Sequence, residues 1–265
     1  MPVDRTRRFA LPNVQDLSKD QDAALALPLD GQHLIVGGPG TGKSVVALLR
    51  VRRLATESKN YRFLAYNKLL DQSSRHLFGN ELNAFTLDAW FRRLWKSLFR
   101  ENVPLLQADH PGGYQAIDWQ SVTNRLQNGA LPQHSYSLPF LVIDEGQDMP
   151  PAFYNALANL KFENFYVVAD QNQQIHPEKC SARQDIENAL AIAPADTLEL
   201  QANYRNTRPI AQLAQHFYPG DPASPKPELP TAKPGASTPE LWSYGNGAAQ
   251  TLEGIAERIL QTSDR

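Results

Sequence analysis

A glycine-rich segment near the N-terminus has the residue types and the spacing of a site that binds a nucleoside triphosphate. Residues 37–44, GGPGTGKS, fit the pattern G-x-x-x-x-G-K-[ST]. Glycines allow successive backbone N–H groups to face the phosphates, Lys43 can contact the β- and γ-phosphate oxygens, and the Ser44 hydroxyl can bind Mg²⁺. A chance match in a chain of this length is on the order of one per cent, so the segment predicts a phosphate-binding loop. Its residues are Gly37, Gly38, Pro39, Gly40, Thr41, Gly42, Lys43 and Ser44.

Two acidic residues follow a short apolar run in the middle of the chain. Asp144 and Glu145 come directly after residues 141–143, which have the pattern of a buried strand. The carboxyl end of such a strand is where nucleotide-hydrolysing enzymes hold the acidic residue that binds magnesium. We therefore expect Asp144 to hold Mg²⁺ through water and Glu145 to polarise the attacking water. Gln147 and Asp148 extend the motif to D-E-x-Q-D, which has no role in a phosphate-loop kinase.

The elements that position these residues are indicated by short apolar runs between stretches of helical periodicity. Helical spacing is clearest at residues 45–55 and in the aromatic segment 86–100. Alternation of this kind predicts an α/β fold with a mostly parallel sheet flanked by helices. Residues 101–137 are polar and contain several prolines, and we expect a short inserted subdomain outside the sheet. The expected strands are residues 33–36, 61–66, 140–143, 165–169 and 197–200.

Composition restricts the class of protein and its partners. The chain has 265 residues, 42% of them hydrophobic, and a formal net charge of −2, which excludes a protein that coats nucleic acid by bulk charge. Arginine clusters at 5–8, 50–53 and 92–96 are interpreted as solvated helix faces or a tail. Cys180 is the only cysteine, which excludes an internal disulfide and suits a reducing compartment. No apolar run approaches the roughly 18 residues of a membrane span, so we expect a cytoplasmic protein without a membrane partner.

The order of these motifs resembles the UvrD/Rep-like helicases of superfamily 1, over about residues 17–217. That resemblance implies a RecA-like ATP-binding domain, ATP and Mg²⁺ as cofactors, and ATP hydrolysis coupled to movement along single-stranded DNA. The segment LSKDQDAAL resembles the adenine-reading motif of the family, so Gln21 should hydrogen-bond adenine. ADQNQQIH resembles motif III, which makes Gln173 the sensor of the γ-phosphate. NYRN resembles motif IV, where Tyr204 would stack on adenine and Arg205 would contact the γ-phosphate.

The same resemblance implies a surface that contacts single-stranded DNA. AYNKLL at 65–70 resembles motif Ia and FTLDAWF at 85–91 resembles motif Ib. Asp88 stands where motif Ib commonly has histidine, and a carboxylate there would repel phosphate. Trp90 also belongs to an apolar helical stripe with Leu94, Trp95 and Leu98, for which core packing is the alternative interpretation. The implied nucleic-acid contacts are Asn67, Lys68, Thr86, Trp90 and His176.

The C-terminal part of the sequence departs from a complete motor of this family. We expect residues 1–218 to form the ATP-binding domain, 219–239 a proline-rich linker, and 240–265 the first strand and helix of a second motor domain. Motifs V and VI, with their arginine finger, are absent, and such a finger is worth roughly 10³ to 10⁵ in rate. We therefore expect slow ATP hydrolysis and no unwinding by this chain alone, with a second motor domain or another protein as partner. The alternative is an ATP-gated module that binds nucleic acid or protein without translocating.

Overall fold

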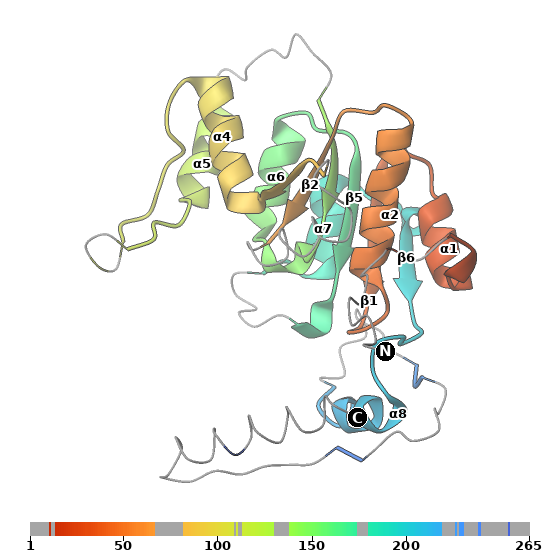
Figure 1. Ribbon diagram of the computed structural model, residues 1–265. Helices are drawn as coiled ribbons and strands as arrows, with labels where there is room; N and C mark the ends of the chain where they lie inside the picture. Colours follow the sequence, from red (N-terminus) through yellow and green to blue (C-terminus); the bar gives the residue numbers. More distant parts are fainter. Residues whose placement is uncertain are drawn as a thin grey trace, which may run out of the picture.

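The computed structural model shows an α/β fold built on a parallel sheet (Figure 1). It describes residues 11, 14–66, 82–108, 110, 113–129, 138–173, 180–218, 226, 228–230, 238–239 and 254. Within these residues six strands form one sheet in the order β3-β2-β4-β5-β1-β6, and every neighbouring pair is parallel. The strands are β1 (Gln32–Gly37), β2 (Tyr61–Ala65), β3 (Ala84–Thr86), β4 (Phe140–Ile143), β5 (Phe165–Ala169) and β6 (Thr197–Leu200).

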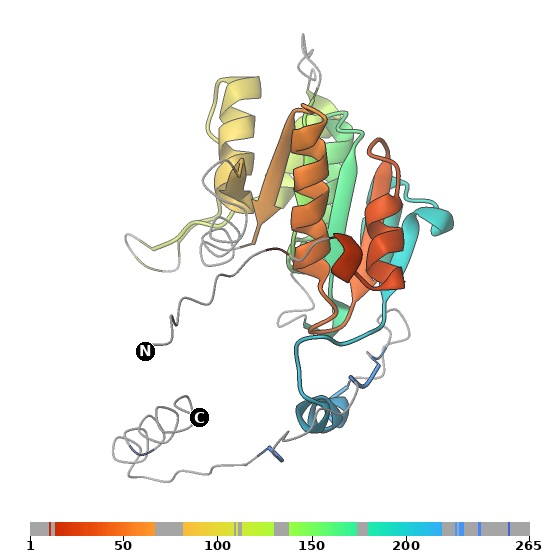
Figure 2. The same cartoon turned by 45° about the vertical axis from the view of Figure 1, so that its right-hand side comes forward.

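The expected fold is confirmed, and the sheet gains β3 at its edge as a short strand that the sequence pattern did not reveal. Helices lie on both faces of the sheet (Figure 1, Figure 2). The α-helices are α1 (Lys19–Ala26), α2 (Lys43–Thr56), α4 (Leu87–Phe99), α5 (Trp119–Asn128), α6 (Pro151–Asn159), α7 (Arg183–Leu190) and α8 (Arg208–Gln215). Short 3₁₀ helices are η1 (Val14–Asp16), η2 (Gly146–Asp148), η3 (Gln171–Gln173) and η5 (Pro194–Asp196).

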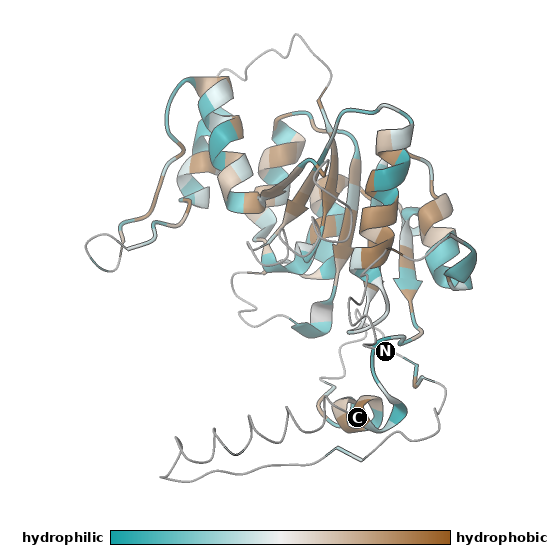
Figure 3. Cartoon of the chain, in the orientation of Figure 1, coloured by the Kyte–Doolittle hydropathy of each residue, from teal (hydrophilic) through white to brown (hydrophobic). Residues whose placement is uncertain are grey.

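Alternate residues of the central strands divide the core into two layers. Leu34 and Val36 of β1 join the cluster that packs under α4, α5, α6 and α7, whereas Ile35 joins the cluster under α1 and α2. Successive side chains of a strand point to opposite faces, so a strand covered on both faces must be apolar throughout. Figure 3 shows the central strands mostly in brown, between helices on which brown and teal residues alternate. None of the helices in the described parts of the chain has the length and hydrophobicity that a bilayer crossing requires.

The segment that follows α4 lies outside the sheet but extends the core. Leu105 and Ile117 form an antiparallel bridge, and the Asp118 side chain accepts a hydrogen bond from the Ser121 N–H to begin α5. Apolar side chains of this segment are buried against α4 and α6. Residues 130–137 of the expected insertion lie outside the described residues. The buried side chains are Val103, Ile117, Val122 and Leu126.

Most of the expected C-terminal organisation lies outside the described residues. Glu228, within the expected linker 219–239, forms an isolated parallel bridge with Ala202 and donates its N–H to the Gln201 carbonyl at 2.7 Å. The expected strand and helix of residues 240–265 are not among the described elements, so that expectation stays a prediction.

Two arginines of the cluster at 50–53 bind the end of α1 rather than solvent. Arg50 is 1% exposed, and its guanidinium donates to the carbonyls of Leu27 and Pro28. It also lies 4.7 Å from the centroid of the Tyr166 ring. Burial lowers the pKa of Arg50 to about 10, which leaves the group charged at neutral pH. The interpretation of this cluster as a solvated face is therefore wrong for Arg50, because its side chain is buried and donates to carbonyls at the C-terminal end of α1 that have no partner within the helix.

Arg53 makes the same kind of contact one turn further along α2. Its Nη1 donates to the Leu25 carbonyl at 2.9 Å and to the Leu27 carbonyl at 3.2 Å. The two arginines fasten α1, and with it Gln21, against the helix that follows the phosphate-binding loop.

We predict that Arg50→Met destabilises the protein by about 1–3 kcal/mol, since the Pro28 carbonyl loses its charged donor and the Leu27 carbonyl keeps only the bond from Arg53. Arg52→Met is the matched control, because Arg52 is exposed on the same helix and its loss should change stability by no more than about 0.5 kcal/mol. Urea denaturation followed by circular dichroism measures both values. Equal free energies of unfolding for the two variants would contradict the role given to Arg50.

Candidate nucleotide-binding site

The predicted phosphate-binding loop connects β1 to α2 in the strand-loop-helix arrangement that the motif requires. Gly40 and Gly42 have φ angles of 82° and 89°, in the left-handed region. A Cβ at Gly40 would lie 2.5 Å from Asn203 Oδ1, and one at Gly42 would collide with the Gln21 amide nitrogen. Glycine is required at both positions for conformation and for space. The Thr41 hydroxyl donates to the Gly38 carbonyl at 2.9 Å and closes the turn.

Lys43 is buried and folds back over this loop. Its ammonium group donates to the carbonyl oxygens of Gly37 at 2.8 Å and Gly38 at 2.9 Å, and it forms an ion pair with Asp170 Oδ2 at 3.0 Å. A lysine ammonium has three N–H donors, and these three acceptors satisfy all of them. Asp170 was missed in the sequence analysis, although it lies inside ADQNQQIH directly after β5. Its signal was an acidic residue at the carboxyl end of a strand, as at Asp144.

Asp144 and Ser44 meet where the predicted magnesium ligands should lie. The Ser44 hydroxyl donates to Asp144 Oδ1 at 3.2 Å. Asp144 is almost fully buried, and burial together with the neighbouring Glu145 carboxylate raises its pKa to about 6. Burial and Glu145 likewise raise the pKa of Asp148 to about 6. Crowded, poorly solvated carboxylates of this kind are stabilised in their charged form by a cation.

The donor set at this position fits Mg²⁺. A hydroxyl and a carboxylate oxygen are hard oxygen ligands, and magnesium in nucleotide sites is held by one or two carboxylates together with the phosphates. Among the described residues, no group of three or more His, Cys, Asp or Glu side chains could hold a metal ion by itself. The protein would thus supply only part of the coordination, through Ser44 and Asp144.

Glu145 is held in a strained backbone conformation beside this pair. Its φ of 53° and ψ of 46° lie in the left-handed region, which a residue with a side chain adopts at an energetic cost. Gln147 donates from Nε2 to Glu145 Oε2 at 2.8 Å and accepts the Asp170 N–H at Oε1, also at 2.8 Å. This buried amide therefore connects the carboxylate expected to activate water with the residue that binds Lys43.

Gln21 supports the loop from the side of α1. Its backbone N–H and its amide oxygen form a reciprocal capping box with Ser18, and its Nε2 donates to the Thr41 carbonyl at 2.9 Å. Both polar atoms of the side chain are thus engaged within the chain, and the side chain is buried. The role of Gln21 in adenine recognition stays a prediction, because adenine would have to exchange for one of these bonds.

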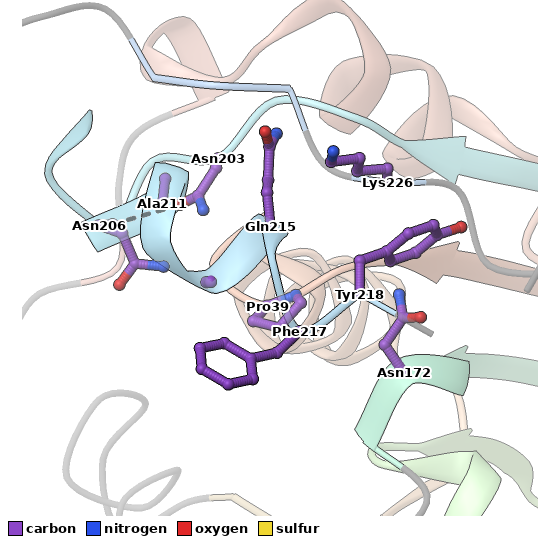
Figure 4. Close-up of a pocket in the computed structure, with 10 residues that line it drawn as sticks. Pro39, Asn172, Asn203, Asn206, Ala211, Gln215, Phe217, Tyr218 and Lys226 are labelled. Atoms are coloured by element: carbon purple, nitrogen blue, oxygen red, sulfur yellow. Dashed lines mark hydrogen bonds between the residues drawn. The ribbon is translucent and has the colours of Figure 1, made fainter. Parts of the chain in front are cut away.

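The motif IV segment docks onto the tip of the loop. The Tyr204 N–H donates to the Gly40 carbonyl at 2.9 Å, and Asn203 Oδ1 accepts the N–H groups of Arg205 and Asn206, each at 3.2 Å. The side chains of Tyr204 and Arg205 remain exposed, as binding a nucleotide would require. A cavity of about 210 Å³ opens between this segment, the loop and α8 (Figure 4). Its lining includes Pro39, Asn172, Asn203, Asn206 and Tyr218.

Gln173, the predicted γ-phosphate sensor, is exposed at the end of η3 and donates its N–H to the Asp170 carbonyl at 3.1 Å. Gln173 therefore lies in the same loop after β5 as Asp170. Gln173 thus lies three residues after Asp170 at the carboxyl edge of the sheet, and its role as γ-phosphate sensor stays a prediction.

The predicted nucleic-acid contacts are described only in part. Asn67, Lys68 and His176 lie outside the described residues. Thr86 ends β3 and precedes α4 at the carboxyl edge of the sheet. Trp90 is only 6% exposed and packs edge-on against Phe162, with ring centroids 5.8 Å apart. This corrects the expectation that Trp90 contacts DNA, because its ring already packs in the core.

Comparison with known proteins places the chain among helicase domains. Residues 32–230 match the family model described as Schlafen group 3, DNA/RNA helicase domain. A search of curated proteins found none that matches. Among solved structures, the crystal structure of Bacteroides Pif1 bound to ssDNA is 15% identical, with a TM-score of 0.39. That similarity covers 75% of this chain and 44% of the other, so the chain spans less than half of that structure.

The family match agrees with the coarser part of the sequence interpretation, a RecA-like helicase domain, and does not extend to the UvrD/Rep class. It begins at β1 and includes the phosphate-binding loop, the acidic motif, the loop after β5 and the motif IV segment. Since the match spans most of the chain, this protein belongs to the Schlafen group 3 DNA/RNA helicase domain family.

Proposed function

We propose that this chain is the ATP-binding motor domain of a helicase, which hydrolyses ATP with Mg²⁺ and couples hydrolysis to contact with single-stranded nucleic acid. The observation that carries the proposal is the continuous chain of contacts from the buried Lys43 through Asp170 and Gln147 to the partly buried Glu145. It joins the phosphate-binding loop to the residue that would activate water, which a domain that only bound nucleotide would not require.

At the phosphate end, Lys43 has to exchange partners when ATP binds. Its three present acceptors belong to Gly37, Gly38 and Asp170. An oxygen of the β- or γ-phosphate can replace one or more of them, since the phosphate carries more charge than a carbonyl. The loop N–H groups and the N-terminus of α2 then face the phosphates without rearrangement.

At the hydrolytic end, Glu145 accepts a proton from the attacking water. Gln147 fixes one oxygen of its carboxylate, and the Glu145 backbone is held in the left-handed conformation. Bound Mg²⁺ supplies positive charge that offsets the charge developing on the phosphate oxygens. Ser44 and Asp144 would hold that ion, and the exposed Arg205 would contact the γ-phosphate.

We also propose three more specific properties of this domain. Movement along single-stranded DNA, the UvrD/Rep class and adenine stacking on Tyr204 are supported by the motif order in the sequence. The alternative, an ATP-gated module that does not translocate, shares the ATP site. The two functions differ in what happens when hydrolysis is blocked. In the non-translocating module, a variant that cannot hydrolyse ATP would bind its partner as the parent protein does.

We predict that Lys43→Ala weakens Mg²⁺–ATP binding at least tenfold and lowers stability by about 2–4 kcal/mol, because Asp170 then stays buried without its cation. The double variant Lys43→Ala/Asp170→Asn should recover most of the stability and none of the affinity. Isothermal titration calorimetry and thermal denaturation separate the two effects. ATP affinity unchanged in Lys43→Ala would exclude residues 37–44 as the nucleotide site, and equal affinity for GTP in the parent would exclude adenine recognition.

We predict that Glu145→Gln retains ATP binding but reduces hydrolysis by about 10²- to 10⁴-fold, because an amide cannot accept the proton of water. Asp144→Ala should instead weaken the Mg²⁺-dependent part of ATP affinity. Phosphate release, measured with and without oligonucleotide, tests both variants. Hydrolysis at the parent rate in both would show that the acidic motif is not the catalytic centre.

A further inference from the structure

An exposed tyrosine with a fixed orientation projects from the segment between α4 and α5. This segment extends away from the sheet in Figure 1, and it is held by the Leu105–Ile117 bridge and by a 2.9 Å hydrogen bond from the Leu106 N–H to the Ala116 carbonyl. Tyr114 is 72% exposed. Its hydroxyl nevertheless donates to Asp88 Oδ1 at 2.8 Å, which connects this segment to the first turn of α4.

Arg92 completes the support of this ring. Its Nε donates to Asp88 Oδ2 at 2.6 Å and its Nη2 donates to the Gln115 carbonyl at 2.5 Å. The guanidinium carbon lies 5.7 Å from the centroid of the Tyr114 ring. The cation thus lies over the ring, and most of the Tyr114 side chain remains exposed. A ring fixed in this way loses little conformational freedom when a second flat group stacks on it.

These contacts change the interpretation of Asp88. The sequence analysis expected its carboxylate to repel the phosphate backbone at motif Ib. In the structure, Arg92 neutralises that charge by a bidentate contact, and Tyr114 adds a third hydrogen bond. Asp88, which lies two residues after Thr86 at the edge of the sheet where the strand-binding surface is expected, therefore positions the Tyr114 ring.

The surrounding charge favours a nucleic-acid strand over a protein. Lys96 lies four residues after Arg92, on the same face of α4. Its side chain is exposed and forms no ion pair with the described residues. Arg93 is also exposed, and its guanidinium carbon lies 5.7 Å from the centroid of the Phe85 ring. Cations beside an open aromatic ring are the combination by which single-stranded nucleic acids are held, through phosphate contacts and base stacking.

We propose that Tyr114 is a stacking platform for one base of single-stranded DNA or RNA, positioned by Asp88 and Arg92. This inference rests on the proposed nucleic-acid function. Stacking on a tyrosine does not read base edges, so the platform accepts any base. It also supplies an aromatic contact that comes from the segment between α4 and α5 rather than from motif Ib.

The test compares the parent chain with Tyr114→Ala, Tyr114→Phe and Tyr114→Leu by fluorescence anisotropy. The probes are oligothymidylate, oligouridylate and an abasic deoxyribose-phosphate chain of equal length. Loss of one stacked base should weaken binding of the base-containing probes about 5- to 150-fold in Tyr114→Ala. Tyr114→Phe, which keeps the ring, should lose much less than Tyr114→Leu, which keeps apolar volume without an aromatic face.

The abasic probe and the salt dependence provide the controls. Tyr114→Ala should bind the abasic chain as the parent does, and the slope of log K against log salt should be unchanged because no phosphate contact is lost. Equal affinity of parent and Tyr114→Ala for the base-containing probes would overturn the platform and leave the proposed function intact. If the parent chain binds no probe, the nucleic-acid part of the proposed function fails, and this inference fails with it. The affinities of the parent chain for oligothymidylate and oligouridylate show whether the platform prefers DNA or RNA.

Discussion

The ion pair between Lys43 and Asp170 lies where the phosphate-binding loop, the acidic motif and the loop after β5 meet. Both side chains are buried, and a charge in such a place is tolerated only when a partner and hydrogen bonds replace its water. The sheet supplies that proximity, because β1 and β5 pair in parallel with Val36 beside Ala169. The loops that follow these two strands therefore leave the same edge side by side, 127 residues apart in the chain.

At the same edge, one buried side chain connects the acidic motif to the loop after β5. Gln147 accepts the Asp170 N–H and donates to Glu145 with one amide group, so displacement of Lys43 from Asp170 bears on both loops. The parallel strands all end at this edge, and β4 and β5 are followed there directly by Asp144 and Asp170. The strained conformation of Glu145 is maintained there by a rigid surrounding, which includes Tyr154 donating to the Gly146 carbonyl at 2.6 Å.

Charged residues elsewhere in the domain serve its assembly as much as its chemistry. Arg50 and Arg53 supply donors to the carbonyls at the end of α1, which keeps Gln21 against the phosphate-binding loop. Asp88 and Arg92 form a neutral pair that orients Tyr114. The net charge of the chain does not reveal these roles, because it does not show which charged side chains have partners within the chain.

Local patterns were enough to predict the phosphate-binding loop, the acidic motif and five of the six described strands, because glycine spacing and apolar runs can be recognised without knowing any distant contact. The sequence by itself could not separate the buried Arg50 from the exposed Arg52, since burial depends on which face of α2 meets α1. It also could not reveal that Asp170 binds Lys43 or that Tyr114 binds Asp88. Those contacts join residues distant in the chain, and only the order of strands and the packing of the segment between α4 and α5 bring them within hydrogen-bonding distance.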